Sequence, residues 1–315
     1  MDETPKLLAG PDITGEIGPT SDFYWGCRWK SLRARCIDTA HKLVHYPGTS
    51  QKRRIFHLGR LAAKMCRRMD LDPTHTVFRQ VCTAELVDRH WVRRGPEPCN
   101  RMRILIIGDG AGILSGLLKE MFPSSSIVLV DIGKSLLYQA YHCQKANPGL
   151  IHMLAEEDTD TSQADFLYCP TENLHTLEKL EFDVAINIAS MQEMNSGTID
   201  RYFDFLRRRL KADNLFYCCN RESKTLIGGE ISKFHNYPWH PNDTVLLEGE
   251  PTWHRYIVGK PLAQDGPNIL GVRIPYMSYY DGVILHRLTV LATEGDSSGG
   301  NETLPGSHMT DEPAL

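Results

Sequence analysis

Residues 104–122, ILIIGDGAGILSGLLKEMF, hold the most specific pattern of chemically useful residues in the chain. An apolar run ends at Gly108, glycines recur at positions 110 and 112, and an amphipathic stretch follows. Glycine permits a tight turn and a close approach of the backbone to a ligand, and the first turn of a helix offers unpaired N–H groups. The pattern predicts a ligand-binding turn between a strand and a helix, made of Gly108, Asp109, Gly110 and Gly112.

A second apolar run, residues 126–131, ends in Asp131, 19 residues beyond Gly112. An acidic side chain at the end of the second strand can accept hydrogen bonds from both hydroxyls of a ribose. Asp131 and the adjacent Ile132 therefore predict a ligand that contains a nucleoside. A dinucleotide fingerprint would require glycine where Ile113 stands, and a phosphate-binding loop would require Gly-Lys-Ser/Thr in this turn.

The G-x-G-x-G turn with an acid at the end of strand two resembles motif I and its ribose-binding partner in the class I S-adenosylmethionine-dependent methyltransferases. The resemblance implies that S-adenosylmethionine is the cofactor, with its methionine side at the glycine turn and its ribose on Asp131. It also implies adenine contacts from Thr171 and Glu172, after strand three, and contacts to the methionine moiety from Asn187 and Ile188, after strand four. Both segments fit ordinary strand ends equally well.

Nucleobases are disfavoured as methyl acceptors. Amino methyltransferases of nucleic acids place Asp/Asn-Pro-Pro-aromatic after strand four, where this chain has NIAS at residues 187–190. Methylation of a base at C5 needs a catalytic cysteine, usually in a Pro-Cys pair, whereas Cys169-Pro170 is reversed and lies on another strand.

Residues 182–206, 216–223 and 239–256 carry a narrower resemblance, in which SMQEM at 190–194 and NRES at 220–223 are the more specific pieces. They are similar to the sugar O-methyltransferases found with bacterial polysaccharide and glycoconjugate genes, over residues 23–292. The resemblance implies transfer of a methyl group to a hydroxyl of a sugar or a sugar-containing metabolite. Two alternatives stay open: O- or N-methylation of another small natural product, and an inactive methyltransferase-like binding module.

Polar side chains follow the fourth and fifth predicted strands, where the ligands of a doubly wound sheet bind. Amide, guanidinium and carboxylate groups suit a polyhydroxylated substrate, whose hydroxyls need both donors and acceptors. Gln192, Asn220 and Arg221 are therefore predicted to contact the substrate, and Glu193 and Glu222 are candidate catalytic bases. A polar loop with helix caps is the structural alternative.

The loop KFHNYPWHPND, residues 233–243, supplies further candidates. His240 is the predicted general base, oriented by Asp243, because imidazole is available in its neutral form near pH 7. His235 and Trp239 are predicted to contact the substrate, and Tyr237, Trp239 and Trp253 could stack on a sugar ring. Glu193, Glu222 and Asp243 could bind Mg²⁺ through oxygen ligands, but their spacing has no metal signature and no metal ligand is predicted.

The regions around these residues alternate between strand-like and helix-like patterns from residue 102 onward. Apolar runs at 103–108, 126–131, 164–169, 182–188 and 214–219 are separated by helix-like stretches at 113–122, 135–146 and 198–212. This βα alternation predicts an α/β fold with a doubly wound, mostly parallel, Rossmann-like sheet. Residues 244–250, 253–259, 268–277 and 282–293 are further strand-like segments, which could add an antiparallel edge and a substrate lid.

The ends of the chain differ in character from this region. Residues 1–22 are predicted to be a flexible N-terminus, 23–100 a helical cap of three or four helices, 101–292 the cofactor-binding domain with its substrate-binding region, and 293–315 a disordered acidic tail. Residues 28–103 hold 18 Lys and Arg against 6 Asp and Glu, an excess of 12. That excess, with Arg53 and Arg54 as examples, favours a small anionic acceptor such as a nucleotide-sugar; a solvated helix face is the plainer explanation.

Composition limits the remaining possibilities. The hydrophobic fraction of 41% supports a core, and no apolar run is long enough for a membrane span. The nine cysteines form no CxxC pair, which predicts free thiols in a reducing, cytoplasmic compartment. Nucleic acid is an improbable partner because the basic segment lacks interleaved aromatic residues, and a homo-oligomer is compatible with the sequence.

Overall fold

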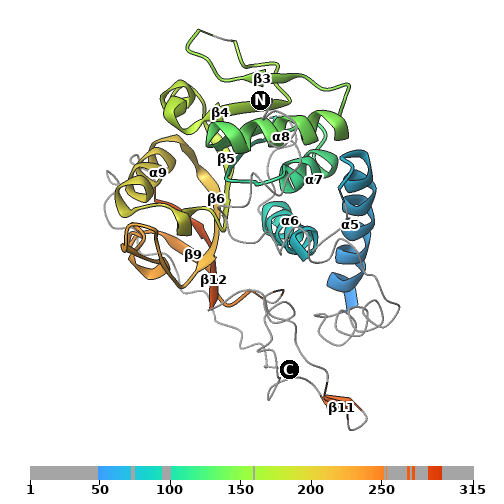
Figure 1. Cartoon of the computed structure of the whole chain (residues 1–315), viewed down its shortest axis with the longest axis vertical. Helices are drawn as coiled ribbons and strands as arrows, with labels where there is room; N and C mark the ends of the chain where they lie inside the picture. Colours follow the sequence, from blue (N-terminus) through green and yellow to red (C-terminus); the bar gives the residue numbers. More distant parts are fainter. Residues whose placement is uncertain are drawn as a thin grey trace, which may run out of the picture.

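The computed structural model describes residues 49–71, 75–93, 101–158, 160–251, 253, 268–269, 272–273 and 283–292. Its centre is an eight-stranded sheet with the order β3-β4-β2-β1-β5-β6-β12-β9 (Figure 1). Strands β3, β4, β2, β1, β5 and β6 pair in parallel, and β12 pairs antiparallel with both β6 and β9. The predicted doubly wound, mostly parallel sheet is confirmed.

The strands match the predicted apolar runs closely. The sheet consists of β1 (Arg103–Ile107), β2 (Ser126–Asp131), β3 (His152–Leu154), β4 (Phe166–Pro170), β5 (Phe182–Ile188), β6 (Leu210–Arg221), β9 (Thr244–Gly249) and β12 (Ile284–Val290). Two small hairpins accompany it: β7 (Ser223–Thr225) with β8 (Ile231–Lys233), and β10 (Asn268–Ile269) with β11 (Val272–Arg273). The short edge strand β3 and the β7–β8 hairpin were not predicted.

The order of the strands creates a switch point beside β1. From β1 the chain moves outward to β2 and β4, and it then returns to place β5 on the other side of β1. In such sheets ligands bind where the carboxyl ends of the two central strands diverge. Those ends are Ile107, which continues into Gly108, and Ile188, which continues into Ala189.

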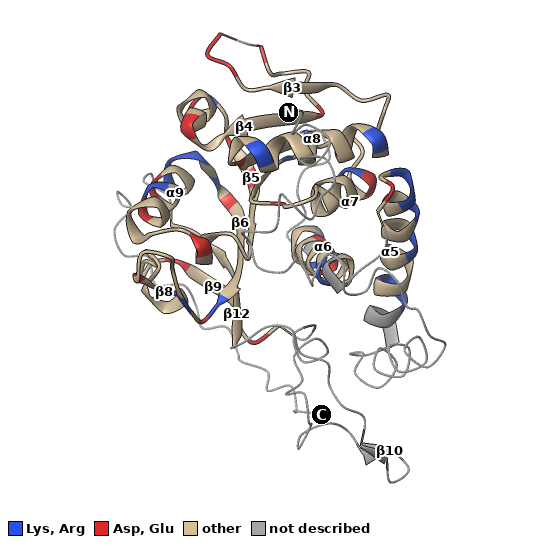
Figure 2. Cartoon of the chain, viewed as in Figure 1, with Lys and Arg blue, Asp and Glu red and all other residues tan. Residues whose placement is uncertain are grey.

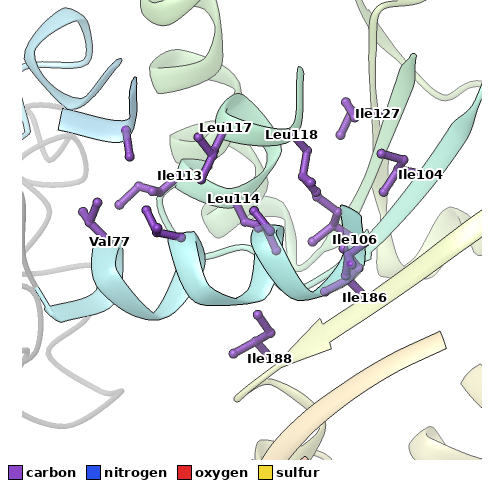
Figure 3. Close-up of a cluster of buried hydrophobic side chains, with 14 of the residues drawn as sticks. Val77, Ile104, Ile106, Ile113, Leu114, Leu117, Leu118, Ile127, Ile186 and Ile188 are labelled. Atoms are coloured by element: carbon purple, nitrogen blue, oxygen red, sulfur yellow. The ribbon is translucent and has the colours of Figure 1, made fainter. Parts of the chain in front are cut away.

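Helices cover both faces of the sheet. They are α5 (Thr49–Arg68), α6 (His75–Arg93), α7 (Ile113–Met121), α8 (Gly133–Ala146) and α9 (Ser196–Arg209). Ile104 and Ile106 of β1 belong to the core shared with α5 to α8, and Leu105 and Ile107 belong to the core shared with α9. Figure 3 shows the first core, in which α6 and α7 pack over β1 and β5. Because both faces are buried, the central strands β1 and β5 are mostly apolar, with Arg103, Asp183 and Asn187 as their polar residues.

The described part of the predicted helical cap is continuous with this layer. Met65 of α5 and Met69, just beyond its end, lie over Gly116 of α7, where their sulfur and methyl atoms would be 2.7 and 2.9 Å from an added Cβ. Arg68 at the end of α5 forms an ion pair with Glu120 of α7. Helices α5 and α6 therefore share one core with the sheet, and residues 23–48 of the predicted cap lie outside the described residues.

One predicted boundary is corrected. Residues 210–212, assigned to the third helix, begin β6, and Leu210 pairs with Phe182 of β5. The C-terminal segments add antiparallel pairing at this side of the sheet, as expected: β12 pairs with β6 and with β9, which is the edge strand. Most of residues 253–259 and 268–277, and the N- and C-terminal segments 1–22 and 293–315, lie outside the described residues.

Two predictions from composition can be compared with the described residues. No helix among them combines the length and the apolar character that crossing a bilayer requires. Their six cysteines, Cys66, Cys82, Cys143, Cys169, Cys218 and Cys219, are all free thiols, as expected.

Candidate active site

The turn between β1 and α7 has a backbone that favours glycine at three positions. Gly108, Gly110 and Gly112 have φ angles of +77°, +64° and +75°. These values lie in the left-handed region, which costs an L-residue about 1–2 kcal/mol. The spacing of the three glycines in the sequence therefore reflects the backbone conformation of this turn.

Each glycine also has a different environment. A Cβ on Gly108 would lie 2.3 Å from the Cβ of Ser190, and one on Gly112 would lie 2.8 Å from the sulfur of Cys143. Gly110 is exposed, and no atom of the described residues lies within 4 Å of that position. The outer two glycines thus pack the turn against its neighbours, while the middle one faces open space where a ligand can approach.

Asp109 holds the start of α7 and does not face that space. Its carboxylate is buried and accepts hydrogen bonds from the backbone N–H groups of Leu114 (3.1 Å) and Ser115 (2.8 Å). Burial raises the pKa of Asp109 to about 6, against the opposing effect of the hydrogen bonds from Ser115 and Leu114. The side chain predicted to bind the cofactor therefore acts as a helix cap, which orients the turn from within.

Asp131 stands at the same edge of the sheet. Val130 pairs with Ile107, so Asp131 is level with Gly108 on the neighbouring strand. Its carboxylate accepts hydrogen bonds from the N–H of Ile132 (2.8 Å) and from the side-chain amide of Gln139 (2.6 Å). Burial raises the pKa of Asp131 to about 6, although both hydrogen bonds favour the ionised form.

Ile132 and the residues that follow β4 lie beside Asp131. The side chain of Ile132 is 60% exposed, at the first residue after β2. Asp131 pairs with Pro170 at the end of β4, so Thr171 and Glu172 begin at the same edge. Thr171 accepts a hydrogen bond from the phenol of Tyr202 (3.4 Å), and Glu172 is exposed. Their contact with an adenine stays a prediction.

Asn187 is fully buried at the end of β5 and bonds only to protein groups. Its amide nitrogen donates to the carbonyl of Ile107 (2.9 Å) and to the hydroxyl of Ser190. Its oxygen accepts from the side chain of Asn220 (2.8 Å) and from the N–H of Met191 (3.4 Å). Ile188 is buried in the apolar core. The side chains of Asn187 and Ile188 are thus placed to support the glycine turn. The predicted contacts of these two residues with the cofactor would have to come from their backbone atoms.

A similar correction applies to two predicted substrate residues. Asn220 is buried and accepts a hydrogen bond from the N–H of Gln192 (3.1 Å), and the side-chain oxygen of buried Gln192 accepts from the N–H of Arg221 (2.7 Å). Together with Asn187 they form a chain of three amide side chains that connects the ends of β1, β5 and β6. Their polar groups are engaged within the protein, so they position neighbouring residues.

The polar side chains near the three amide residues are more exposed to solvent. Arg221 is the last residue of β6 and is partly exposed, and Glu222 after it is exposed. Glu193 is exposed and forms an ion pair with Lys224 of β7. Phe234 donates its N–H to the carbonyl of Glu222 (2.9 Å), which brings the adjacent, exposed His235 to this end of β6.

His240 lies near the amino end of β6, away from the glycine turn at the carboxyl ends of the strands. Its prediction as the general base is therefore wrong. The carboxylate of Asp243 accepts from the backbone N–H of His240 (2.8 Å) and from that of Ala292 (3.0 Å), just beyond β12. Leu291, next to Ala292, bonds to Asn214 near the beginning of β6. Asn214 and Arg221 are seven residues apart, or about 23 Å along a strand.

Asp243 likewise has a structural role. It forms two hydrogen bonds with the guanidinium of Arg207, at 2.7 and 3.0 Å, and its side chain is 1% exposed. It therefore neither orients the imidazole of His240 nor lies near Glu193 and Glu222. No group of three or more His, Cys, Asp or Glu side chains among the described residues is arranged to hold a metal ion.

The aromatic residues predicted to stack on a sugar pack against protein instead. Trp239 contacts Phe203, Phe216 and Phe234 edge-on or tilted, and Arg287 lies 4.2 Å from its ring centroid. Its indole N–H donates to the carbonyl of Phe234 (3.0 Å). Tyr237 and Trp253 are 5% and 3% exposed. The predicted sugar-stacking roles of these three residues are therefore wrong.

Ser190 belongs to the predicted segment after strand four, but its own role, like that of Gln139, was missed in the sequence. Ser190 donates a hydrogen bond to the carbonyl of Ile107 (2.9 Å) and packs against Gly108. Gln139 bonds to Asp131 from α8. Neither belongs to a recognisable spacing, and only the packing of β5 and α8 beside the turn reveals them.

No protein-family model and no curated protein sequence matches the chain. Solved structures that resemble it include the pyocyanin biosynthetic protein PhzM, with 13% identity over 45% of this chain and 38% of that one and a TM-score of 0.30. The cyclopropane synthase MmaA2 from Mycobacterium tuberculosis shows 17% identity over 44% and 43% with a TM-score of 0.31. An S-adenosylmethionine-dependent methyltransferase from Clostridium acetobutylicum shows 11% over 66% and 90% with a TM-score of 0.40.

The aligned part spans less than half of the first two of these structures. Identities of 17% or less and TM-scores of 0.40 or less assign neither a family nor a function to this chain. What can be said of the site comes from its own residues.

Proposed function

We propose that this protein is an S-adenosylmethionine-dependent methyltransferase that transfers a methyl group to a hydroxyl of a sugar or a sugar-containing metabolite. The observation that carries the proposal is the turn at the switch point, where Gly110 faces open space between two packed glycines. Asp131, a carboxylate suited to ribose hydroxyls, is level with this turn on the next strand. The sugar is the finer part of the proposal and depends on the resemblance of the later sequence blocks.

The residues present fit such a cofactor better than a dinucleotide. Ile113 is buried at the first position of α7, which leaves no glycine there for a pyrophosphate to approach. Gly108 and Gly112 would shape the turn beside the methionine portion, Asp131 would accept hydrogen bonds from the ribose, and Ile132 would offer an apolar side chain to the adenine. The bound cofactor supplies an electrophilic methyl group on a sulfonium.

The acceptor site in this proposal lies at the carboxyl ends of β5 and β6. Arg221, Glu222, Glu193 and His235 are among the polar side chains that reach solvent there. His235 or Glu222 would take the proton from the acceptor hydroxyl while its oxygen forms the bond to the methyl group, and the cofactor would leave as a neutral thioether. Positioning of the hydroxyl in line with the methyl group would supply most of the rate.

The charge of α5 supports an anionic acceptor or partner. The helix contains seven Lys and Arg and no acidic residue, and several stretches of its ribbon are blue in Figure 2. Arg53, Arg60, Lys64 and Arg67 are exposed and share one side of the helix at a spacing of three to seven residues. A nucleotide-sugar or another small anionic sugar derivative would be attracted to such a surface.

Calorimetric titration with S-adenosylmethionine, S-adenosylhomocysteine and NAD tests the cofactor. We expect micromolar binding of the first two, no binding of NAD, and loss of binding in Asp131→Ala. Absence of binding by folded protein would remove the proposal. Incubation with neutral and anionic sugars, followed by mass spectrometry and NMR of the products, then tests the acceptor and the methylated position.

A further inference from the structure

Gln139 of α8 lies between the two halves of the proposed cofactor site. Its side chain is fully buried. Its amide nitrogen donates a hydrogen bond of 2.6 Å to Oδ2 of Asp131, and the N–H of Ile132 donates to Oδ1. The two bonds hold different oxygens of the carboxylate, so together they fix its rotation about the side-chain axis.

The opposite side of Gln139 supports the glycine turn. Its backbone oxygen and Cα lie 3.2 and 3.4 Å from the position that a Cβ of Gly112 would occupy. One residue therefore contacts both the carboxylate proposed for the ribose and the turn proposed for the methionine portion. A change in its position would move the two parts of the site relative to each other.

The orientation of the amide follows from its partner. A carboxylate oxygen only accepts hydrogen bonds, so the nitrogen of Gln139 must face Asp131. The amide oxygen then points away, and it is buried without a hydrogen-bond partner among the described residues. A buried, unpaired amide oxygen is costly. An apolar side chain of equal length would avoid this cost, which indicates that the donated bond to Asp131 has a use.

We propose that Gln139 is a positioning residue for cofactor binding, which orients the carboxylate of Asp131 toward the two hydroxyls of the ribose. The inference rests on the proposed function, because it requires a ribose at Asp131. Gln139 itself touches no ligand atom in this proposal and acts through Asp131. Its effect should therefore be limited to ligands that carry those hydroxyls.

The test compares two ligands, S-adenosylhomocysteine and its 2′,3′-dideoxy analogue, by calorimetry. Gln139→Met keeps the length of the side chain and removes the donor. We expect it to weaken binding of S-adenosylhomocysteine about tenfold and to leave binding of the dideoxy analogue within about twofold. Gln80→Met is a matched control, since Gln80 is also a buried helical glutamine, on α6. It should change neither affinity.

A second variant tests the donated proton directly. Gln139→Glu can donate to Asp131 only while the introduced carboxyl is protonated. Its affinity for S-adenosylhomocysteine should therefore fall as the pH rises from 5 to 8, whereas the affinity of the wild type should not fall. A purely structural role of Gln139 would not produce this opposite pH dependence.

The outcomes separate this inference from the proposed function. Equal weakening of both ligands by Gln139→Met, or no weakening of either, would overturn the positioning role while cofactor binding stands. Equal binding of both ligands by the wild type would also overturn it, because the ribose would not be on Asp131. No binding of S-adenosylhomocysteine by the folded wild type would overturn both.

Discussion

Gly110 and Gly108 offer a pair of substitutions that separates ligand binding from folding. Both residues have a positive φ, +64° and +77°, so alanine at either position meets the same backbone strain of about 1–2 kcal/mol. Only Gly108 has a neighbour in the way, Ser190, at 2.3 Å from the new Cβ. At Gly110, the part of the chain that the structure describes places no atom within 4 Å of the new Cβ.

These distances set the expected magnitudes. Gly110→Ala should lower the free energy of unfolding by about 1–2 kcal/mol, from strain alone. Gly108→Ala should add an overpacking cost of about 1–3 kcal/mol, for a total of about 2–5 kcal/mol. Because the Cβ in Gly110→Ala enters the space proposed for the cofactor, that variant should bind S-adenosylhomocysteine at least tenfold more weakly, which is about 1.4 kcal/mol.

Urea unfolding without ligand and calorimetric titration measure the two effects. A double-variant cycle with Ser190→Gly isolates the overlap, since it removes both Ser190 atoms that lie closest to the new Cβ. We expect a coupling free energy of about 1–3 kcal/mol between Gly108→Ala and Ser190→Gly. The hydrogen bond that Ser190 loses to Ile107 cancels in the cycle, because it is lost in both backgrounds.

Two results would refute this reasoning. Unchanged affinity for S-adenosylhomocysteine in Gly110→Ala would show that the space at Gly110 is not where the ligand binds. Zero coupling between the changes at Gly108 and Ser190 would show that the two residues do not pack against each other as described.

Three other predictions follow from the site. Affinity for S-adenosylhomocysteine should weaken about tenfold between pH 7 and pH 5, because Asp131 has a raised pKa of about 6 and the ribose hydroxyls favour its ionised form; calorimetry on Asp131→Asn should show a flat profile. Asn220→Asp should lower the free energy of unfolding by about 1–3 kcal/mol at pH 7, because the buried group then turns an oxygen toward the side-chain oxygen of Asn187. A shift of the urea midpoint toward the wild-type value at low pH would support this reason, and an unchanged midpoint would contradict it. Once an acceptor is known, His240→Ala should leave kcat within about twofold, since His240 lies near the amino end of β6. His235→Ala should lower kcat about a hundredfold if His235 is the base. An equal loss of kcat in both variants would contradict this placement.

Much of the cofactor side of the site could be predicted because it is local in sequence. The strand β1, the turn from Gly108 to Gly112 and the helix α7 follow each other within 19 residues, and glycine spacing reports the backbone directly. Asp131 could be placed because parallel strands joined by a helix bring their carboxyl ends to one edge. The roles of Asp109 and Asn187 could not be predicted, because the same polar residue types occur in side chains that contact a ligand and in side chains that support the backbone beneath it.

The substrate side was harder for a different reason. His235 and His240 are only five residues apart, and both lie in a loop rich in aromatic residues. Between them the chain leaves the carboxyl end of β6, buries Tyr237 and packs Trp239, so that His240, together with Asp243, lies near the amino end of β6. Proximity in the sequence therefore says little about which edge of the sheet a loop residue occupies.

The sequence by itself determined the doubly wound sheet, the glycine turn and the carboxylate beside it, because hydrophobic periodicity and glycine spacing are local properties of the chain. Only the tertiary structure decided which polar side chains face the open site and which hold it in place. Asp109, Asn187, Asn220 and Gln192 are turned inward because buried polar groups must find partners. Asp109 finds them in the following helix, whereas the other three bond to residues up to about 80 positions away. Gln139 joins the site for the same reason, through a contact that only the packing of α8 against β2 creates.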